Sequence, residues 1–129
     1  MVSDSLVNRI SRLAFNVGLP VMLFAGAAQV DYSQLADARY VPYGESGMHP
    51  HLEVDVITIM LEGRLTHEGS MKHGQSMVAN QAQVQRAGGE GFDHNEINPD
   101  ESRTRLLQVW ALPEASGSAA DYKIYDTND

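Results

Sequence analysis

Four side chains that can bind a metal stand in two pairs, each with one residue between its members. His49 and His51 form the first pair, and His94 and Glu96 form the second. Residues two apart in an extended strand point to the same face of a sheet, whereas on a helix the same spacing turns them apart. If the two strands lie side by side, three imidazoles and one carboxylate converge. The spacing therefore predicts a mononuclear metal site on paired strands.

The available donor atoms narrow the choice of metal without deciding it. The chain has no cysteine, so thiolate ligation, disulfides and a cysteine nucleophile are excluded. Imidazole together with carboxylate suits a divalent Fe, Mn, Co, Ni, Cu or Zn ion. Zinc favours four tetrahedral ligands, whereas an octahedral iron or nickel ion would keep two positions open for other ligands.

The other histidines and one acidic residue are weaker candidates for this site. His67 and His73 fall in expected hairpin or loop positions, so we expect neither to bind the metal. Asp55 could orient a ligand imidazole from behind, or it could lie on a solvated strand face. A lone His-x-His pair is often an incidental surface feature, but two pairs on expected strands favour a metal site.

The composition is that of an ordinary globular domain. Of 129 residues, 43% are hydrophobic and 20% are charged, and nine basic against seventeen acidic residues give a net charge of −8. Nucleic acid and anionic membrane surfaces are disfavoured as partners, because both attract basic proteins.

The first 37 residues are expected to form an N-terminal arm that packs on the domain over residues 38–129 or on a dimer partner. Apolar residues recur at helical spacing across residues 3–16, which predicts a short helix. A strand is expected over residues 21–24, and a less regular connection over residues 26–37.

The apolar run over residues 13–28 allows a second interpretation, a cleaved secretory signal that ends in small residues. Asn16, Gly18 and Pro20 interrupt this run, and it is too short for a clean membrane-spanning helix. We therefore expect an ordered arm and a cytoplasmic protein.

From residue 38 onward the chain consists of short β-prone runs separated by turn residues. Strands are expected over residues 39–43, 54–61, 64–67, 76–79, 83–86, 92–97, 103–112 and 122–125. Evenly spaced short strands with glycines at the bends favour a closed barrel. The sequence therefore predicts one all-β barrel.

The long run over residues 103–112 alternates between two faces. One face carries Leu106, Gln108, Trp110 and Leu112, and the other carries Leu107, Val109 and Ala111. We expect one face to line a pocket and the other to take part in outer packing.

Several motifs occur in the order typical of the pirin family. They are Met48-His49-Pro50-His51, the run over residues 56–63, His67 with Ser70 and Met71, glycines 88, 89 and 91, His94-Asn95-Glu96, and the run over residues 107–113. Over residues 38–126 the chain therefore resembles a pirin. Pirins are cupins, so the resemblance implies a conical jelly-roll β-barrel with a metal in its mouth.

The resemblance also implies a site and an activity. It makes His49, His51, His94 and Glu96 the metal ligands, with iron as Fe(II) the expected ion. For several pirins it implies a dioxygenase that cleaves flavonols such as quercetin, so we expect a small phenolic substrate. In that chemistry Glu96 would take the hydroxyl proton of the substrate. The alternative is a non-catalytic regulatory or binding module whose metal tunes contact with a protein partner.

The chain departs from the family pattern in length. Pirins usually carry two cupin domains, whereas 129 residues suffice for one of the metal-binding N-terminal type. The second domain would cover part of the pocket, so substrate specificity stays open. Single-domain cupins often dimerise, and the apolar residues 17–30 are suited to pack on a neighbour. We therefore expect a homodimer.

Overall fold

Nine strands make up the described part of the chain, residues 32–128 of a computed structural model. They are β1 (Tyr32–Tyr40), β2 (His49–His51), β3 (Asp55–Glu62), β4 (Arg64–Gly69), β5 (Gln75–Val78), β6 (Gln81–Arg86), β7 (Phe92–Ile97), β8 (Thr104–Ala111) and β9 (Asp121–Asp126). The expected N-terminal helix and the strand over residues 21–24 lie outside the described residues. Within residues 32–128 no helix is long and apolar enough to cross a membrane.

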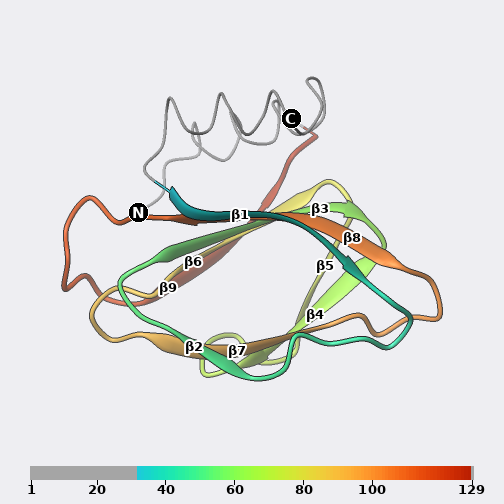
Figure 1. The fold of residues 1–129 in the computed structure, drawn as a ribbon, viewed down its shortest axis with the longest axis horizontal. Coiled ribbons are helices and arrows are strands. Elements are labelled where there is room, and N and C mark those ends of the chain that lie inside the picture. The colour runs from blue at the N-terminus through green and yellow to red at the C-terminus, as the bar shows by residue number, and fades with distance from the viewer. Residues whose placement is uncertain (1–31, 129) are drawn as a thin grey trace.

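The strands form two antiparallel sheets that face each other (Figure 1). The five-stranded sheet has the order β1-β8-β3-β6-β9, and the four-stranded sheet has the order β2-β7-β4-β5. Apart from β4 and β5, no two neighbours in a sheet are consecutive along the chain, as in the pairing of β3 with β8. The predicted all-β architecture is confirmed, and β7 has the bounds expected from the sequence.

One expected irregular segment is a strand. Residues 32–37, taken from the sequence as part of a loose connection, belong to β1, which pairs with β8 from Tyr32 to Tyr40. The prediction was wrong here because this segment lacks a strong apolar alternation. Pairing with the edge of β8, which is distant in sequence, makes it a strand. The expected boundary between arm and barrel after residue 37 falls inside β1.

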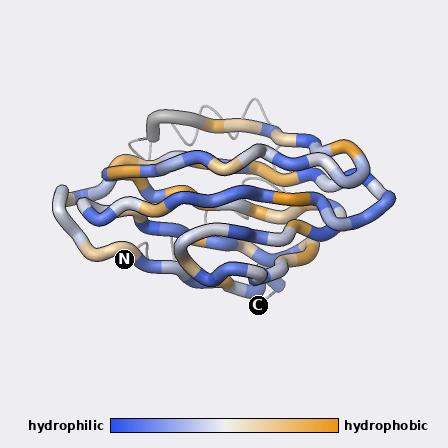
Figure 2. The backbone as a smooth tube through the Cα atoms, turned by 90° about the horizontal axis from the view of Figure 1, so that it is seen from below, coloured by the Kyte–Doolittle hydropathy of each residue, from blue (hydrophilic) through white to orange (hydrophobic). Residues whose placement is uncertain are grey.

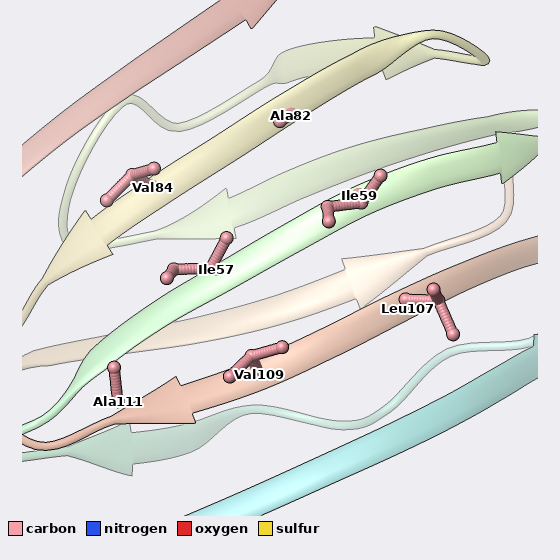
Figure 3. Packing of buried hydrophobic residues seen from close by; sticks show 7 residues of the cluster. All are labelled: Ile57, Ile59, Ala82, Val84, Leu107, Val109 and Ala111. Atoms are coloured by element: carbon pink, nitrogen blue, oxygen red, sulfur yellow. The ribbon is translucent and has the colours of Figure 1, made fainter. Parts of the chain in front are cut away.

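The five-stranded sheet has two distinct faces, because side chains alternate along each strand. Figure 2 shows this alternation of hydrophilic and hydrophobic residues along the strands. The face turned away from the second sheet carries one buried apolar cluster, drawn in Figure 3: Ile57, Ile59, Ala82, Val84, Leu107, Val109 and Ala111.

The space between the sheets holds two further apolar clusters. Val54, Val56, Ala87 and Phe92 form one of them. Met60, Leu65, Met77 and Leu106 form the other. Buried polar side chains also face this space, among them Thr58, Gln83, Gln85 and Gln108, together with three of the predicted ligands, His51, His94 and Glu96. The interior is therefore apolar in places and polar around the candidate site.

Candidate metal centre

The register of two strands brings the predicted ligand pairs together. β2 lies antiparallel to β7, with His49 opposite His94 and His51 opposite Phe92. β2 is an edge strand of its sheet, so Pro50, which has no N–H group to donate, is tolerated there. These two short strands therefore pair side by side, as the spacing of the ligands predicts.

Three histidines from these strands form a group that could hold a metal ion, the one such group found among residues 32–128. The ligand atoms of His49, His51 and His94 all lie within 4.8 Å of one another. The Nε2 atom of His94 lies 3.0 Å from that of His49 and 3.1 Å from that of His51.

Hydrogen bonds behind two of the rings decide which nitrogen carries the proton. Nδ1 of His49 lies 2.8 Å from the carbonyl oxygen of Gly47, and Nδ1 of His94 lies 3.0 Å from Oε1 of Gln85. Both oxygens can only accept, so both Nδ1 atoms donate, and a ring that carries only this proton presents its Nε2 lone pair to the other ring. Two lone pairs facing each other at 3.0 Å repel unless a cation lies between them. The donor set therefore fits a divalent metal.

Burial keeps two of these imidazoles neutral. Loss of hydration, and then the electrostatic effect of the nearby His49, lower the pKa of His51 to about 4. The pKa of His94 falls to about 3, mainly through burial and then through His49, His51 and His67. At neutral pH both rings are therefore free of the competing proton that would block metal binding.

Glu96 is buried beside the histidine group and held by hydrogen bonds. Nε2 of Gln108 lies 3.0 Å from each carboxylate oxygen, and the Tyr40 hydroxyl donates over 3.2 Å. Burial raises the pKa of Glu96, while the hydrogen bonds from Gln108 and Tyr40 act against that rise. The carboxylate is not part of the three-histidine group. Its role as a fourth ligand stays a prediction.

Sequence reasoning missed the residues that support the ligands. Gln85 on β6 orients His94, and Gln108 on β8 with Tyr40 on β1 holds Glu96. A signal was present in β6, where glutamines alternate with apolar residues in a strand with a buried interior. One face of β8 reaches the candidate site, because Gln108 contacts Glu96 from there. That this face lines a pocket stays a prediction.

Two of the three remaining candidates are more buried than expected. His67, the last residue of the strand expected over residues 64–67, lies in β4 and is buried, with Nε2 donating to the carbonyl of Met71 over 2.7 Å. Its ring centroid is 5.4 Å from that of His94, yet it is outside the three-histidine group. His73 is exposed. Asp55 is buried rather than solvated, and Gln85 takes the supporting place behind His94.

Aromatic side chains flank the histidines. The ring of His51 is 5.0 Å from that of Phe92 and 4.8 Å from that of Trp110, measured between centroids. Nε1 of Trp110 donates to Oε1 of Gln108 over 3.0 Å, which joins this wall to the residues that hold Glu96. The centre thus combines convergent nitrogen donors, a buried carboxylate and an apolar wall.

The family model described as Pirin matches residues 20–111. The chain belongs to the pirin family. As a pirin it is 42% identical over 81 residues to a putative quercetin 2,3-dioxygenase of Zymomonas mobilis, which covers 63% of this chain and 34% of that protein. It is 36% identical over 78 residues to the quercetin 2,3-dioxygenase of Escherichia coli K12, covering 60% of this chain and 33% of that enzyme. The chain therefore spans about a third of the length of these relatives.

A solved pirin structure shows the same fold. The Escherichia coli pirin YhhW in complex with nickel(II) matches with a TM-score of 0.71 at 28% identity, covering 75% of this chain and 42% of that one. The two facing sheets are therefore the cupin barrel that the resemblance implied.

Proposed function

We propose that this pirin is a metal-dependent dioxygenase that acts on a small phenolic substrate of the quercetin type. One observation carries the proposal: the Nε2 atoms of His49, His51 and His94 converge, with two of their lone pairs held face to face. The names of the relatives, quercetin 2,3-dioxygenases, support the substrate class.

Iron, as Fe(II), is the metal we propose, with Zn, Mn, Ni, Co and Cu as alternatives. Metal–nitrogen bonds are about 2.1 Å long, so nitrogens bound to one ion lie about 3 Å apart. The Nε2 atom of His94 is 3.0 Å from that of His49 and 3.1 Å from that of His51, which suits one shared ion. Nickel in the structure of a relative is consistent with a divalent transition metal.

Each residue around the proposed metal would have a distinct role. His49, His51 and His94 would hold the ion, which when bound supplies a Lewis acid and a partner for oxygen chemistry. Glu96 would complete the ligand set and accept the proton of a phenolic hydroxyl, because burial has made its carboxylate more basic. Gln108 and Tyr40 keep that carboxylate in place, and Trp110 would give an aromatic substrate an apolar wall.

Two further parts of the proposal concern the whole chain. A homodimer remains proposed on the strength of the apolar residues 17–30, which lie outside the described residues. A cytoplasmic location also stays a prediction, and fractionation of cells would test it.

The first test is metal analysis of protein purified without oxygen, followed by oxygen uptake with quercetin. We expect one bound transition metal per chain and uptake that depends on it. His94→Ala should lose both, whereas His73→Ala, a histidine exposed outside the site, should keep both.

The outcomes separate the candidate functions. Bound metal without turnover of any flavonol or catechol would contradict the dioxygenase and favour the regulatory module. Absence of metal from both the unsubstituted protein and His94→Ala would overturn the metal site itself.

A further inference from the structure

A chain of hydrogen bonds runs from the last strand to the back of His94. The Tyr122 hydroxyl on β9 donates to Oε1 of Gln83 over 3.0 Å, and Nε2 of Gln83 donates to Oε1 of Gln85. That same Oε1 faces Nδ1 of His94. We call Tyr122, Gln83 and Gln85 the glutamine relay.

The imidazole of His67 packs against both ends of this chain, His94 and Tyr122. Its imidazole centroid is 5.4 Å from that of His94 and 5.5 Å from that of Tyr122. Gln83, Gln85, His67 and His94 are all at most 2% exposed. Water therefore has little access to the hydrogen bond behind His94, and a protein group must determine its direction.

The direction of the relay decides the tautomer of His94. In the structure Tyr122 donates to the carbonyl of Gln83, the amide NH₂ of Gln83 points toward Gln85, and the carbonyl of Gln85 accepts from it. An acceptor behind His94 requires hydrogen on Nδ1, which leaves Nε2 free to bind a metal. If the Gln85 amide turned over, its NH₂ would face Nδ1, and the proton would move to Nε2.

We propose that Gln85, aligned by Gln83 and Tyr122, is a positioning residue that holds His94 in its metal-binding tautomer. This rests on the proposed function only in that His94 is taken as a metal ligand. Supporting residues of this kind commonly change metal affinity 10–100-fold when they are lost. Through Tyr122, the affinity of the site depends on the docking of β9.

Substitutions at Gln85 separate positioning from packing. Gln85→Met keeps the length and volume of the side chain but removes the acceptor. Gln85→Glu keeps an acceptor toward both Gln83 and His94 but adds a buried charge. If Gln85 acts only by packing, Met is tolerated and Glu is not; if it positions His94, the order is reversed.

The experiment is titration of the full chain with cobalt(II), which reports affinity by chelator competition and ligand geometry by its visible absorption. We expect Gln85→Met to bind cobalt 10–100-fold more weakly, with altered absorption bands. Gln85→Glu should bind within about threefold of the unsubstituted protein. Tyr122→Phe should weaken binding several-fold, while Tyr125→Phe, on the outward face of the same strand, should not.

A second measurement needs no metal. In the metal-free protein, ¹⁵N NMR of the imidazoles should show His94 protonated at Nδ1, with the proton redistributed toward Nε2 in Gln85→Met. Tight cobalt binding by Gln85→Met with an unchanged spectrum and tautomer would overturn the inference while leaving the dioxygenase proposal intact. Cobalt binding with the expected order but no oxygen uptake with quercetin would support the inference and contradict the dioxygenase.

Discussion

At the scale of single residues, hydrogen-bond donors stabilise the buried carboxylate of Glu96. Gln108 contacts both of its oxygens, and Tyr40 and Thr58 add further hydrogen bonds. A buried charge that loses such partners keeps its full desolvation penalty. The donors therefore stabilise the fold as well as hold Glu96 in place.

We predict that Gln108→Leu lowers the free energy of unfolding by about 3 kcal/mol in metal-free protein, as measured by urea denaturation. The double variant Gln108→Leu/Glu96→Met should be more stable than Gln108→Leu alone, because it no longer buries an unpaired carboxylate. Gln75→Leu, at an exposed position of β5, should change stability by less than about 0.5 kcal/mol. Additive losses in the double variant would contradict this account of Glu96.

At the scale of elements, the site depends on the close approach of β4 to β7. Gly69 pairs with His94 and has a φ of 155°, and a Cβ atom added there would overlap the carbonyl oxygen of Asp93 and lie 2.9 Å from Cα of His94. Only glycine allows this approach, since the neighbouring atoms belong to the backbone and cannot turn aside.

We predict that Gly69→Ala costs about 3 kcal/mol of stability and weakens metal binding, because β7 must shift together with His94. Gly74→Ala is the matched control: its φ is 80°, but a Cβ atom there would meet nothing within 4 Å. It should cost only about 1 kcal/mol and leave metal affinity unchanged. Denaturation and cobalt titration of both variants provide the check, and equal effects on affinity would count against the role of the β4–β7 approach.

At the scale of the whole molecule, the apolar outer face of the five-stranded sheet must be shielded from water by other residues. Its apolar cluster points away from the metal centre and from the second sheet, yet all seven side chains are buried. The 31 residues that precede β1 include the apolar run at 13–28, and β1 is an edge strand of this same sheet. We therefore propose that residues 1–31 cover this face, either of their own barrel or of a dimer partner.

The change Ile57→Asn tests this prediction. It places a polar amide at a fully buried position of the outer face, so the free energy of unfolding should fall by about 3 kcal/mol or more. Val78→Asn, at a side chain that is 47% exposed, should have little effect.

Light scattering of the full chain distinguishes the two arrangements. A dimer mass that persists after the Ile57→Asn substitution would mean that residues 1–31 cover their own barrel, and a halved mass would mean that they cover the barrel of a dimer partner. A monomer across the micromolar range in the unsubstituted protein would contradict the homodimer.

The sequence alone determined most of the strands of this pirin and its two pairs of candidate ligands. Period-two spacing put His49 with His51 and His94 with Glu96 on common strand faces, and the apolar run of β3 and the bounds of β7 followed from local pattern. These features depend on residues that are close in sequence, so a local pattern is enough to predict them.

Only the tertiary structure determined which residues form hydrogen bonds to the candidate metal ligands. Gln85, Gln108 and Tyr40 come from three different strands, and they meet the site through pairings between distant parts of the chain. The same long-range pairing made residues 32–37 a strand and buried His67 in β4. Local pattern specifies which face a side chain takes, whereas its neighbours across the barrel depend on the register of strands that lie far away in sequence.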